Sequence, residues 1–536
     1  MAESFNLVNE PWIRVRDSEC RIQMLSLREV LVNAHRFAEL AGESPAQDAA
    51  MLRLLIAVVY TVFYRVDENG VPAVLEDEDD ALDRWEEIWK RKAFPSEPIC
   101  AYLKEWEHRL DLLDKDRPFY QVPEAAIPAE LRREKRNAAK LNGNVLQSDN
   151  TSRIFSGQTQ ETYSSLSFSE AARWLLYLHA YDDVSISPKF RKNIGIGWLG
   201  GLGFICADGN NLFETILLNT SFLNWKNELY SEPRPTWERP LRTGDRSAHI
   251  VPNNIPELFT LQSRRICLTK QEDRVDGYYS CGGDVLSAKD AFPETMTIWT
   301  KLKKEPGHVP RKISASKYLW RDFSTLIGAG EEAAPPGITV WLTILQNNNL
   351  IEKSRLIRFS TVGVFYDKNK SSVTNTVSDT LSFHADLLSD AGRDWQTRIE
   401  AQVQLCDRLA SAVGTLAGEL SVAAGKRETE NKKLVPPPRM KVAEAAKAQF
   451  YFRIDASFRD WLLKPHAGQS INEVKALVEE WHETAGRIAR DYGRELVDDA
   501  GEPAFLGRWV EIEKDKKQHF STPEAFNRFI GKINSN

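Results

Sequence analysis

Apolar and polar residues alternate with two different periods along the first part of the chain. The opening segment FNLVNEPWIRV, residues 5–15, alternates at the period of a strand and holds a Glu-Pro-Trp corner that cannot continue a helix. Residues 26–40 and 45–64 instead follow the period of a helix, and the second stretch is apolar on nearly every side. The pattern predicts a short first strand followed by two helices, the second of them buried.

Signals at segment ends predict further helices. The acidic connection EDEDDALDRWEEIWKR leads into an amphipathic helix, and three prolines between 118 and 128 then break regular structure. Further along, Ser167 precedes Glu170 by three positions, which is the spacing of a capping box, and an apolar helical face follows it. We therefore expect a helix that starts just after Ser167.

Residues 200–375 combine short β-like runs with turns rich in proline and glycine. Strands are predicted to dominate this region. The four clearest runs are RRICLT at 264–269, MTIWTKL at 296–302, ITVWLTILQ at 338–346 and IRFSTVGVFY at 357–366.

After residue 380 the period changes to that of a helix. Apolar residues from Trp395 to Leu420 recur every three or four positions, and amphipathic segments follow at about 440–463, 470–498 and 522–533. A chain of 536 residues exceeds the size at which a single core stops growing, so at least two domains are expected. We predict a mixed α+β domain over residues 1–380 and an all-α four-helix bundle over residues 381–536.

One polar stretch does not fit either period. Residues 131–165 are almost without apolar periodicity, and a loop of this length is uncommon in a compact domain unless it is functional or disordered. We expect this stretch to be a loop that is mobile in the free protein.

Composition narrows the class of protein only in part. A net charge of −6 says nothing about local basic patches, so it neither indicates nor excludes binding to nucleic acid. The six cysteines are scattered without a CxxC pair, which argues against a disulfide framework and a cysteine-based zinc site. The start lacks the pattern of a signal peptide, and the longest apolar run, at 54–64, is too short to span a bilayer. We expect a soluble, cytoplasmic protein.

Catalytic patterns are weak. The HADLLSD segment places His384, Asp386 and Asp390 close in sequence, but His384 and Asp386 would face different sides of a helix. The HAYDD segment at 179–183 is similarly loose, and the GxSxG, HExxH and Walker A motifs are missing. A metal-dependent hydrolase is thus the least favoured interpretation, and no cofactor or metal is predicted.

Several motifs occur in the order typical of one family, across nearly the whole chain. They are the opening FNLVNEPWIRV, RPFYQ at 117–121, the SEAARWLLYLHAYD helix, the IGIGWLGGLG and ETILLN segments after it, PTWERP at 235–240 and the four C-terminal helices. Together they resemble CasA, the large subunit of the type I-E CRISPR surveillance complex Cascade. This resemblance implies that the opening segment is the first strand of a large mixed domain, with Trp12 in its core.

The resemblance also implies a DNA-recognition subunit without catalysis of its own. Such a subunit binds double-stranded target DNA, recognises the adjacent PAM through the minor groove, promotes strand separation and R-loop formation, and recruits a helicase-nuclease in antiviral defence. Its expected partners are the backbone and small subunits of Cascade and the guide RNA, with no membrane, one copy per complex and a monomer in isolation. The alternative is a structural scaffold of a ribonucleoprotein that does not read DNA directly.

Candidate DNA contacts begin in the polar stretch. Basic residues there could neutralise phosphates, although a solvated charged helix would show the same pattern. A second set resembles the short loop that the family places near the PAM and the 5′ end of the guide, although a surface turn is the alternative. The basic set is Arg132, Arg133, Lys135, Arg136 and Lys140, and the loop set is Ile154, Phe155, Ser156 and Gly157.

A glycine-containing segment, FRKNIGIGWLGGLG at 190–203, would lie against the minor groove according to the resemblance. The most glycine-rich members have consecutive glycines where this chain has Arg191, Lys192 and Asn193. We therefore expect side-chain contacts from Lys192 and Asn193. The later glycines are expected to form a packed turn, and they are Gly200, Gly201 and Gly203.

Two more elements complete the predicted interface. The SAKDAF segment at 287–292 resembles the family stretch that carries a minor-groove lysine, which would be Lys289; an exposed and uninvolved lysine is the alternative. Residues 364–373 read as a hairpin, and its tip corresponds to the family's polar wedge beneath the PAM, with Lys370 where glutamine is usual. The tip residues proposed as DNA contacts are Lys368, Asn369 and Lys370. Minor-groove reading predicts that several PAM sequences are tolerated.

Overall fold

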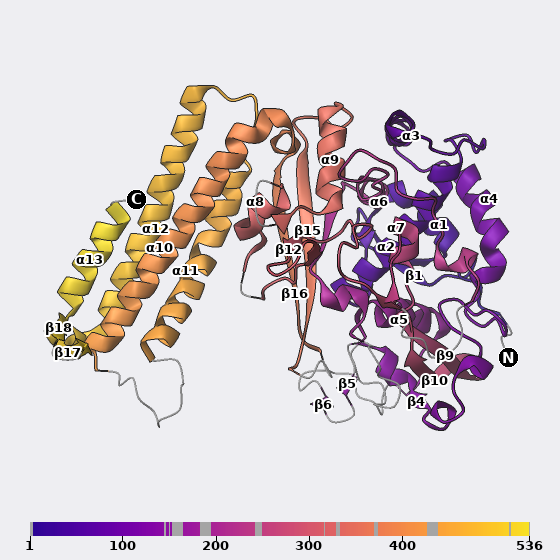
Figure 1. Ribbon diagram of the computed structural model, residues 1–536, viewed down its shortest axis with the longest axis horizontal. Coiled ribbons are helices and arrows are strands. Elements are labelled where there is room, and N and C mark those ends of the chain that lie inside the picture. The colour runs from indigo at the N-terminus through magenta and orange to yellow at the C-terminus, as the bar shows by residue number, and fades with distance from the viewer. Residues whose placement is uncertain are drawn as a thin grey trace. The chain divides into compact units, whose positions relative to one another are not determined.

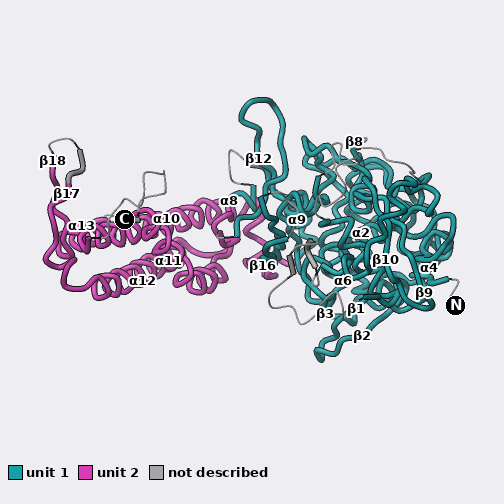
Figure 2. The backbone as a smooth tube through the Cα atoms, turned by 90° about the horizontal axis from the view of Figure 1, so that it is seen from below, with its two compact units in different colours: residues 1–315, 325–351, 357–380 teal, residues 316–324, 352–356, 381–536 magenta. Residues whose placement is uncertain are grey.

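The computed structural model shows a mixed α+β fold with a helical C-terminal region, as the sequence predicts (Figure 1). It describes residues 4–143, 146–148, 151–152, 164–182, 195–241, 249–315, 317–328, 333–368, 373–425, 438–513 and 516–534. The chain divides into two compact units, drawn in different colours in Figure 2. Unit 1 comprises Met1–Ala315, Thr325–Ile351 and Ile357–Thr380, and unit 2 comprises Ser316–Ser324, Glu352–Leu356 and Leu381–Asn536.

Unit 1 is organised around helix α2, Pro45–Arg65, which is buried along nearly its whole length and packs against α4, α5, α6 and α7. Ser44 begins α2 by accepting a hydrogen bond from the Gln47 amide at 3.2 Å, and Pro45 occupies its first turn. The other helices of this unit are α1 Leu27–Val32, α3 Glu78–Arg91, α4 Ser96–Trp106, α5 Phe168–Tyr181, α6 Leu212–Leu218, α7 Ile255–Phe259 and α9 Gly337–Asn347, and α8 spans Phe323–Leu326.

Helix α2 is also longer than the apolar run that the sequence showed. With 21 residues and a mean hydropathy of 1.5, α2 is, among the described residues, the one helix that length and composition would allow to cross a membrane. However, 94% of that apolar window is buried inside the protein, as expected for a core helix.

Small sheets surround these helices. In order within each sheet, the strands are β2 (Ile22–Leu25), β1 (Ile13–Asp17) and β3 (Phe37–Leu40); β4 (Arg136–Asn137), β10 (Arg274–Gly282) and β9 (Arg264–Gln271); β11 (Val285–Leu286) and β8 (His249–Ile250); β13 (His308–Pro310), β12 (Trp299–Lys301) and β14 (Ala333–Ala334); β16 (Val373–His384), β15 (Leu356–Tyr366) and β7 (Phe204–Asp208); and β5 (Leu146–Ser148) and β6 (Thr151–Ser152). Only β8 and β11 pair in parallel among the registers of the described strands.

Predictions near the N-terminus are partly confirmed. Trp12 is fully buried, and its Nε1 donates to the Leu7 carbonyl at 2.8 Å. The first strand begins only at Ile13, because residues 6–10 form a bridge and a turn. The predicted helix at 26–40 is wrong in its second half, since α1 ends at Val32 and β3 pairs with β1. Pairing with a neighbouring strand overrides the local helical period there.

The predicted strand at 338–346 is wrong, because these residues belong to α9. Their β-branched side chains favour a strand, but Ile338, Leu342 and Leu345 share one helical face and are fully buried. Pro336 stands at the N-cap of α9, where the missing amide hydrogen has no cost. The capping box at Ser167 and the strand at 264–269 are confirmed.

Unit 2 is helical. Helix α10, Arg393–Ala423, packs against α11 (Pro438–Leu462), α12 (Ile471–Leu506) and α13 (Thr522–Asn534). The predicted apolar face of α10 is buried, from Trp395 to Leu420. The sequence did not predict the hairpin of β17 (Arg508–Glu513) and β18 (Lys516–Phe520), which connects α12 to α13 (Figure 1).

Candidate nucleic-acid interface

Lys289 lies beside the turn of the β12–β13 hairpin. Its Nζ donates to Glu305 Oε2 at 3.0 Å, and Glu305 sits in the turn between the two strands. The next residue, Asp290, accepts the His308 amide at 2.7 Å, and its own amide donates to the His308 carbonyl at 2.9 Å. These bonds attach the 287–292 segment to the hairpin, so the position of Lys289 is defined by both elements.

Three further lysines gather at the same turn. Lys301, Lys303 and Lys304 are exposed, and in the described part of the chain none of them forms an ion pair. Figure 2 shows β12 at a projecting loop of unit 1. The hairpin thus carries several cations and one carboxylate, Glu305, toward solvent, which is a charge pattern suited to a phosphate backbone.

An aromatic cluster supports this hairpin from beneath. The ring of Phe292 lies 4.5 Å from that of Trp225, 5.0 Å from that of Trp299 and 5.8 Å from that of His308. Trp299 is fully buried. Because packed rings resist displacement, the cluster holds the lysine-bearing surface in place.

The glycine segment packs against the end of β15 that leads into the β15–β16 turn. The six residues between these neighbouring strands are too few for a parallel crossover, so the predicted hairpin is confirmed. A Cβ on Gly200 would lie 2.2 Å from the hydroxyl of Tyr366, the last residue of β15. Gly203 donates to the Arg311 carbonyl at 3.0 Å, and a Cβ there would lie 2.3 Å from Ile313. Gly200 and Gly203 are therefore packed, whereas Gly201 faces open space.

These contacts bring three predicted elements together within unit 1. The glycine segment continues directly into β7, β7 pairs with β15, and Gly203 contacts the chain that leaves β13. The buried residue Arg264 joins the glycine segment to the β9–β10 sheet, because its Nε donates to Asp182 at 2.7 Å and one Nη donates to the Gly195 carbonyl at 3.0 Å. Sequence reasoning missed Arg264; an arginine pair opening an apolar strand was the available signal.

The first part of the polar stretch is not a loop. Residues 131–143 form two 3₁₀ turns and β4, which pairs with β10, and Leu131, Ala138, Ala139 and Leu141 are buried. The expectation of one long mobile loop is therefore wrong for these residues. Their few apolar side chains have no regular period, so only pairing with β10 reveals their structure.

The predicted phosphate contacts have different surroundings. Arg132 and Arg133 are exposed, but Lys135 forms an ion pair with Asp276 at 2.6 Å. Burial raises the pKa of Asp276, yet hydrogen bonds from Lys135 and Thr269 hold that pKa below its usual value. Lys135 is thus already neutralised within the protein. Arg136 and Lys140 are engaged in interactions inside the fold as well.

Of the other predicted contacts, one lies within the described residues. Lys368 is described and exposed at the end of the β15 strand. The remaining ones lie outside the described residues, and they are Ile154, Phe155, Ser156, Gly157, Lys192, Asn193, Asn369 and Lys370.

The side chains that a hydrolase would use, His179, His384 and Asp386, contact backbone groups within the fold instead. His179 is buried and its Nε2 donates to the Tyr120 carbonyl at 2.8 Å, while burial lowers its pKa to about 3. His384 Nε2 lies 3.1 Å from the Leu463 carbonyl, and Asp386 accepts the Ala467 amide at 2.8 Å. Within the described ranges, no group of three or more His, Cys, Asp and Glu side chains could hold a metal ion.

Comparison with known proteins agrees with this architecture. A family model described as CRISPR-associated protein Cse1 matches residues 6–492. A CasA/Cse1 protein of Thermus thermophilus is 28% identical over 337 residues, which cover 61% of this chain and 60% of that protein.

Solved structures extend the likeness to nearly the whole chain. Cse1 of Thermobifida fusca is 26% identical with a TM-score of 0.81, and the match covers 99% of this chain and 97% of that one. Cse1 of Acidimicrobium ferrooxidans is 24% identical with a TM-score of 0.77, over 100% and 99% of the two chains. A chain from a structure titled CRISPR RNA-guided surveillance complex is 18% identical with a TM-score of 0.69, over 99% and 100%.

Fold and family match together define a subunit of a CRISPR surveillance complex. The family match covers most of the sequence, and the order of motifs runs through both units. The chain belongs to the Cse1 family, whose members are also called CasA and form part of the type I-E complex Cascade.

Proposed function

We propose that this chain is the non-catalytic subunit of Cascade that binds double-stranded target DNA and recognises the PAM through the minor groove. It promotes strand separation and R-loop formation, and it recruits the helicase-nuclease that degrades the target. It works in the cytoplasm as one copy per complex beside the guide RNA and the backbone and small subunits. Residues 1–380 carry DNA recognition, and residues 381–536 carry contacts with the complex.

The convergence of three elements is the observation that supports this proposal most. Three elements that are far apart in sequence share contacts through Gly200, Gly203 and β7. They are the β12–β13 hairpin with the adjoining Lys289, the glycine segment and the β15–β16 hairpin. A minor-groove reader needs a cation that can reach base edges, a segment whose polar side chains can contact the groove and an element that can enter beside the base pair. These three elements supply one of each.

Glu305 adds a specific constraint. Its ion pair with Lys289 holds the ammonium on the protein, so DNA must compete with this carboxylate for the same cation. The pair is largely exposed, so its energy is small and a nearby phosphate or base acceptor can replace it. Glu305 therefore weakens non-specific binding more than binding to a matched PAM.

The hydrogen bonds of the candidate catalytic side chains support the proposal that this subunit has no catalytic activity. His179 is committed to the Tyr120 carbonyl and Asp386 to the Ala467 amide, so neither side chain is placed to act as a general base. We therefore expect DNA degradation to depend on the recruited nuclease.

The scaffold alternative also has an observation in its favour. Two of the predicted DNA contacts, Lys135 and Lys289, already form ion pairs within the protein. A subunit that only completed the assembly would need no free cations at these positions.

Binding of the reconstituted complex to duplexes with a randomised trinucleotide beside a matched target tests the proposal. The complex is measured with and without this subunit, and with Lys289→Ala or Asn369→Ala/Lys370→Ala. We expect the subunit to add a trinucleotide preference, and each variant to reduce it about five- to hundredfold, the range for one base contact. Glu305→Gln should instead raise the affinity and flatten the preference.

Lys304→Ala provides the matched control on the same hairpin. Loss of one phosphate contact should weaken all sequences uniformly and reduce the salt slope by about one. If leaving out the subunit changes neither affinity nor preference, the DNA-recognition proposal is wrong and the scaffold alternative replaces it.

A further inference from the structure

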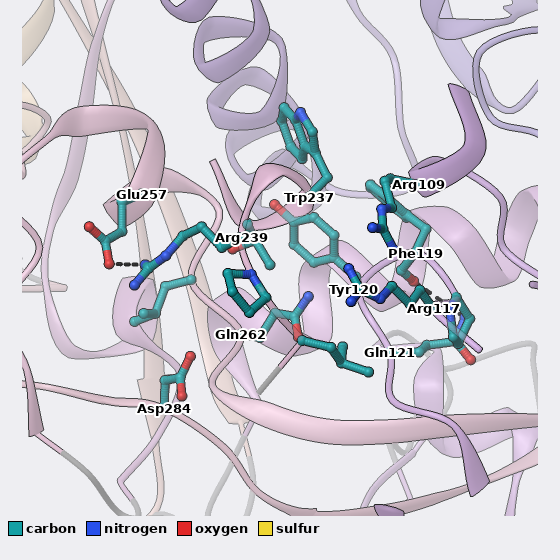
Figure 3. Close-up of a pocket in the computed structure, with 15 residues that line it drawn as sticks. Arg109, Arg117, Phe119, Tyr120, Gln121, Trp237, Arg239, Glu257, Gln262 and Asp284 are labelled. Carbon is teal, nitrogen blue, oxygen red and sulfur yellow. Dashed lines mark hydrogen bonds and ion pairs between the residues drawn. The ribbon is translucent and has the colours of Figure 1, made fainter. Parts of the chain in front are cut away.

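Two motifs that the proposed DNA contacts do not use line one pocket of unit 1. RPFYQ at 117–121 and PTWERP at 235–240 both contribute lining residues, and Figure 3 shows the ring of Tyr120 near the middle of the view with Trp237 above it. Arg109, Glu257, Gln262 and Asp284 contribute further walls. The space between these side chains is about 650 Å³, including the solvent at its open mouth.

One end of the pocket carries two arginines, Arg109 and Arg117, which lie close together in Figure 3. Both are half-buried, and among the described residues neither forms an ion pair with a carboxylate. Arg109 Nε is shielded from solvent and donates no hydrogen bond to any described residue. Burial first, and the charge of Arg117 second, lower the pKa of Arg109, while Asp114 raises it. An added anion would relieve this repulsion and satisfy the unused donors.

The other end is already neutral. Arg239 is paired with Glu257, and Asp284 accepts from Arg265 at 2.5 Å. The exposed Pro240 and the partly exposed Leu241 also line the pocket. The pocket therefore offers one site of excess positive charge and an adjoining apolar surface.

The backbone that presents Arg117 is strained and tightly held. Tyr120 has a φ of 55°, a conformation that is unfavourable for a bulky residue. The bond from His179 to the Tyr120 carbonyl and the bond from Gln121 Nε2 to the Leu112 carbonyl, at 2.8 and 2.9 Å, maintain it. The Arg117 amide donates to Asp114 at 2.6 Å. Strain of this kind, fixed by surrounding contacts, is characteristic of binding sites.

We propose that this pocket binds an acidic peptide segment of a protein partner. An Asp or Glu carboxylate of the segment lies between Arg109 and Arg117, where two guanidinium groups can bind it through paired hydrogen bonds. An apolar neighbour of that residue packs against Pro240 and Leu241. This interaction goes beyond the proposed DNA recognition and does not depend on it.

Recessed arginines favour a peptide over a DNA duplex. Phosphates on a duplex form a rigid convex surface, and cations that contact them project outward. Half-buried guanidinium groups inside a pocket are accessible to a single anion on a flexible chain instead. The apolar surface beside them also has no counterpart in a phosphate backbone.

The test uses the full chain and an array of hexapeptides with one Asp or Glu beside Leu, Phe or Pro. The matched array carries Asn or Gln at the acidic position. We expect acidic peptides to bind at least about tenfold more tightly than their amide counterparts, because hydrogen bonds between charged groups contribute more than those to neutral groups. The Arg109→Gln/Arg117→Gln variant should bind both kinds of peptide equally. Arg109→Lys/Arg117→Lys keeps the charge and should retain part of the binding.

Arg234→Gln is the control, because Arg234 is exposed beside the same motif and is paired with Glu232. It should bind the peptides as the unchanged protein does, and thermal melting checks that every variant is folded. Equal peptide binding by the Arg109→Gln/Arg117→Gln variant, or equal binding of acidic and amide peptides, would overturn the proposal. The proposal would also be overturned, in favour of a nucleic-acid site, by either of two results with a DNA duplex. One is that the duplex displaces the peptides; the other is that the double variant binds the duplex more weakly but binds the peptides unchanged.

Discussion

The two units of this protein differ in where they keep their charged groups. Unit 1 buries ion pairs: Arg53 and Glu294 are 3% and 0% exposed and lie 2.8 Å apart. In unit 2, a pair of similar geometry, Arg453 and Glu495, is 32% and 52% exposed and lies 2.6 Å apart. The ion pair in the irregular unit 1 is thus buried, whereas the ion pair in the helical unit 2 is exposed to solvent.

The reason lies in the backbone. Long helices satisfy their own amides and carbonyls, so unit 2 needs only apolar faces to pack. Unit 1 has short strands and turns whose buried carbonyls need other donors, and arginines supply them: Arg173 donates to the Trp12 carbonyl at 2.7 Å, and Arg65 to the Pro233 carbonyl at 2.7 Å. Irregular backbone is also what places glycines and lysines at the candidate interface.

The largest expected effect comes from breaking the buried pair. Glu294→Ala leaves Arg53 charged and buried, and it removes the acceptor for the Trp198 indole, so we expect a loss of about 3–5 kcal/mol. Hydrogen exchange during urea unfolding, followed separately for peptides of each unit, measures this loss in unit 1. Glu495→Ala in unit 2 should change stability by less than about 1 kcal/mol. Similar losses in both would break the comparison.

The second effect is a pH dependence that belongs to unit 1. Because burial lowers the pKa of His179 to about 3, the unfolded chain binds a proton that the folded chain does not as the pH falls below 6.5. Stability should therefore fall between pH 6.5 and pH 3, by about 3 kcal/mol at pH 4. Denaturant midpoints at a series of pH values measure it.

His179→Gln can keep a donor for the Tyr120 carbonyl but does not titrate, so it should remove this part of the slope. An unaltered slope in the His179→Gln variant would assign the acid sensitivity to other groups.

Close packing in the helical unit gives the third effect. A Cβ on Gly493 of α12 would lie 2.2 Å from the ring of Phe529 in α13, so Gly493→Ala should cost about 1–3 kcal/mol through overpacking. Gly531→Ala meets nothing within 4 Å and should instead stabilise α13 by about 0.5–1 kcal/mol. Thermal melting of the two alanine variants compares them directly; a stabilising Gly493→Ala would mean that the two helices separate easily.

The smallest effect compares the same capping box in both units. Ser167 begins α5 and Ser470 begins α12, and each accepts the amide of a glutamate three residues later, at 3.3 and 3.4 Å. We expect each Ser→Ala change to cost about 0.5–2 kcal/mol, with the larger value for the half-buried Ser167. Melting temperatures measure both. Ser470→Asp preserves the cap and should be nearly neutral, whereas a loss equal to that of alanine would show that capping is not the cause.

Local sequence patterns were sufficient to predict elements that have one apolar and one polar face or a clear end signal. The apolar repeat of α10, the capping box of α5 and the β15–β16 hairpin follow from neighbouring residues alone. Helix α9 was misread because its residues favour a strand locally and are buried on several sides. A buried segment of this kind has no polar face to reveal its period.

The candidate site shows the same division. That Lys289, the glycine segment and the hairpin are basic, small and turn-like is visible in the sequence, and the family resemblance names them. That Glu305 holds Lys289, that Gly200 makes room for Tyr366, and that Arg109 and Arg117 share a pocket all depend on residues distant in the chain. Spacing along the chain carries no information about such contacts.

The amino-acid sequence alone therefore establishes the class of fold, the helical C-terminal region and the family, because these depend on residue periods and on the order of motifs. Tertiary structure was needed to show which cations are already neutralised, which glycines are packed and where residues 131–143 pair. The physical reason is that a side chain's charge, burial and partners are set by whatever lies within a few ångströms, and in unit 1 those neighbours come from distant parts of the chain.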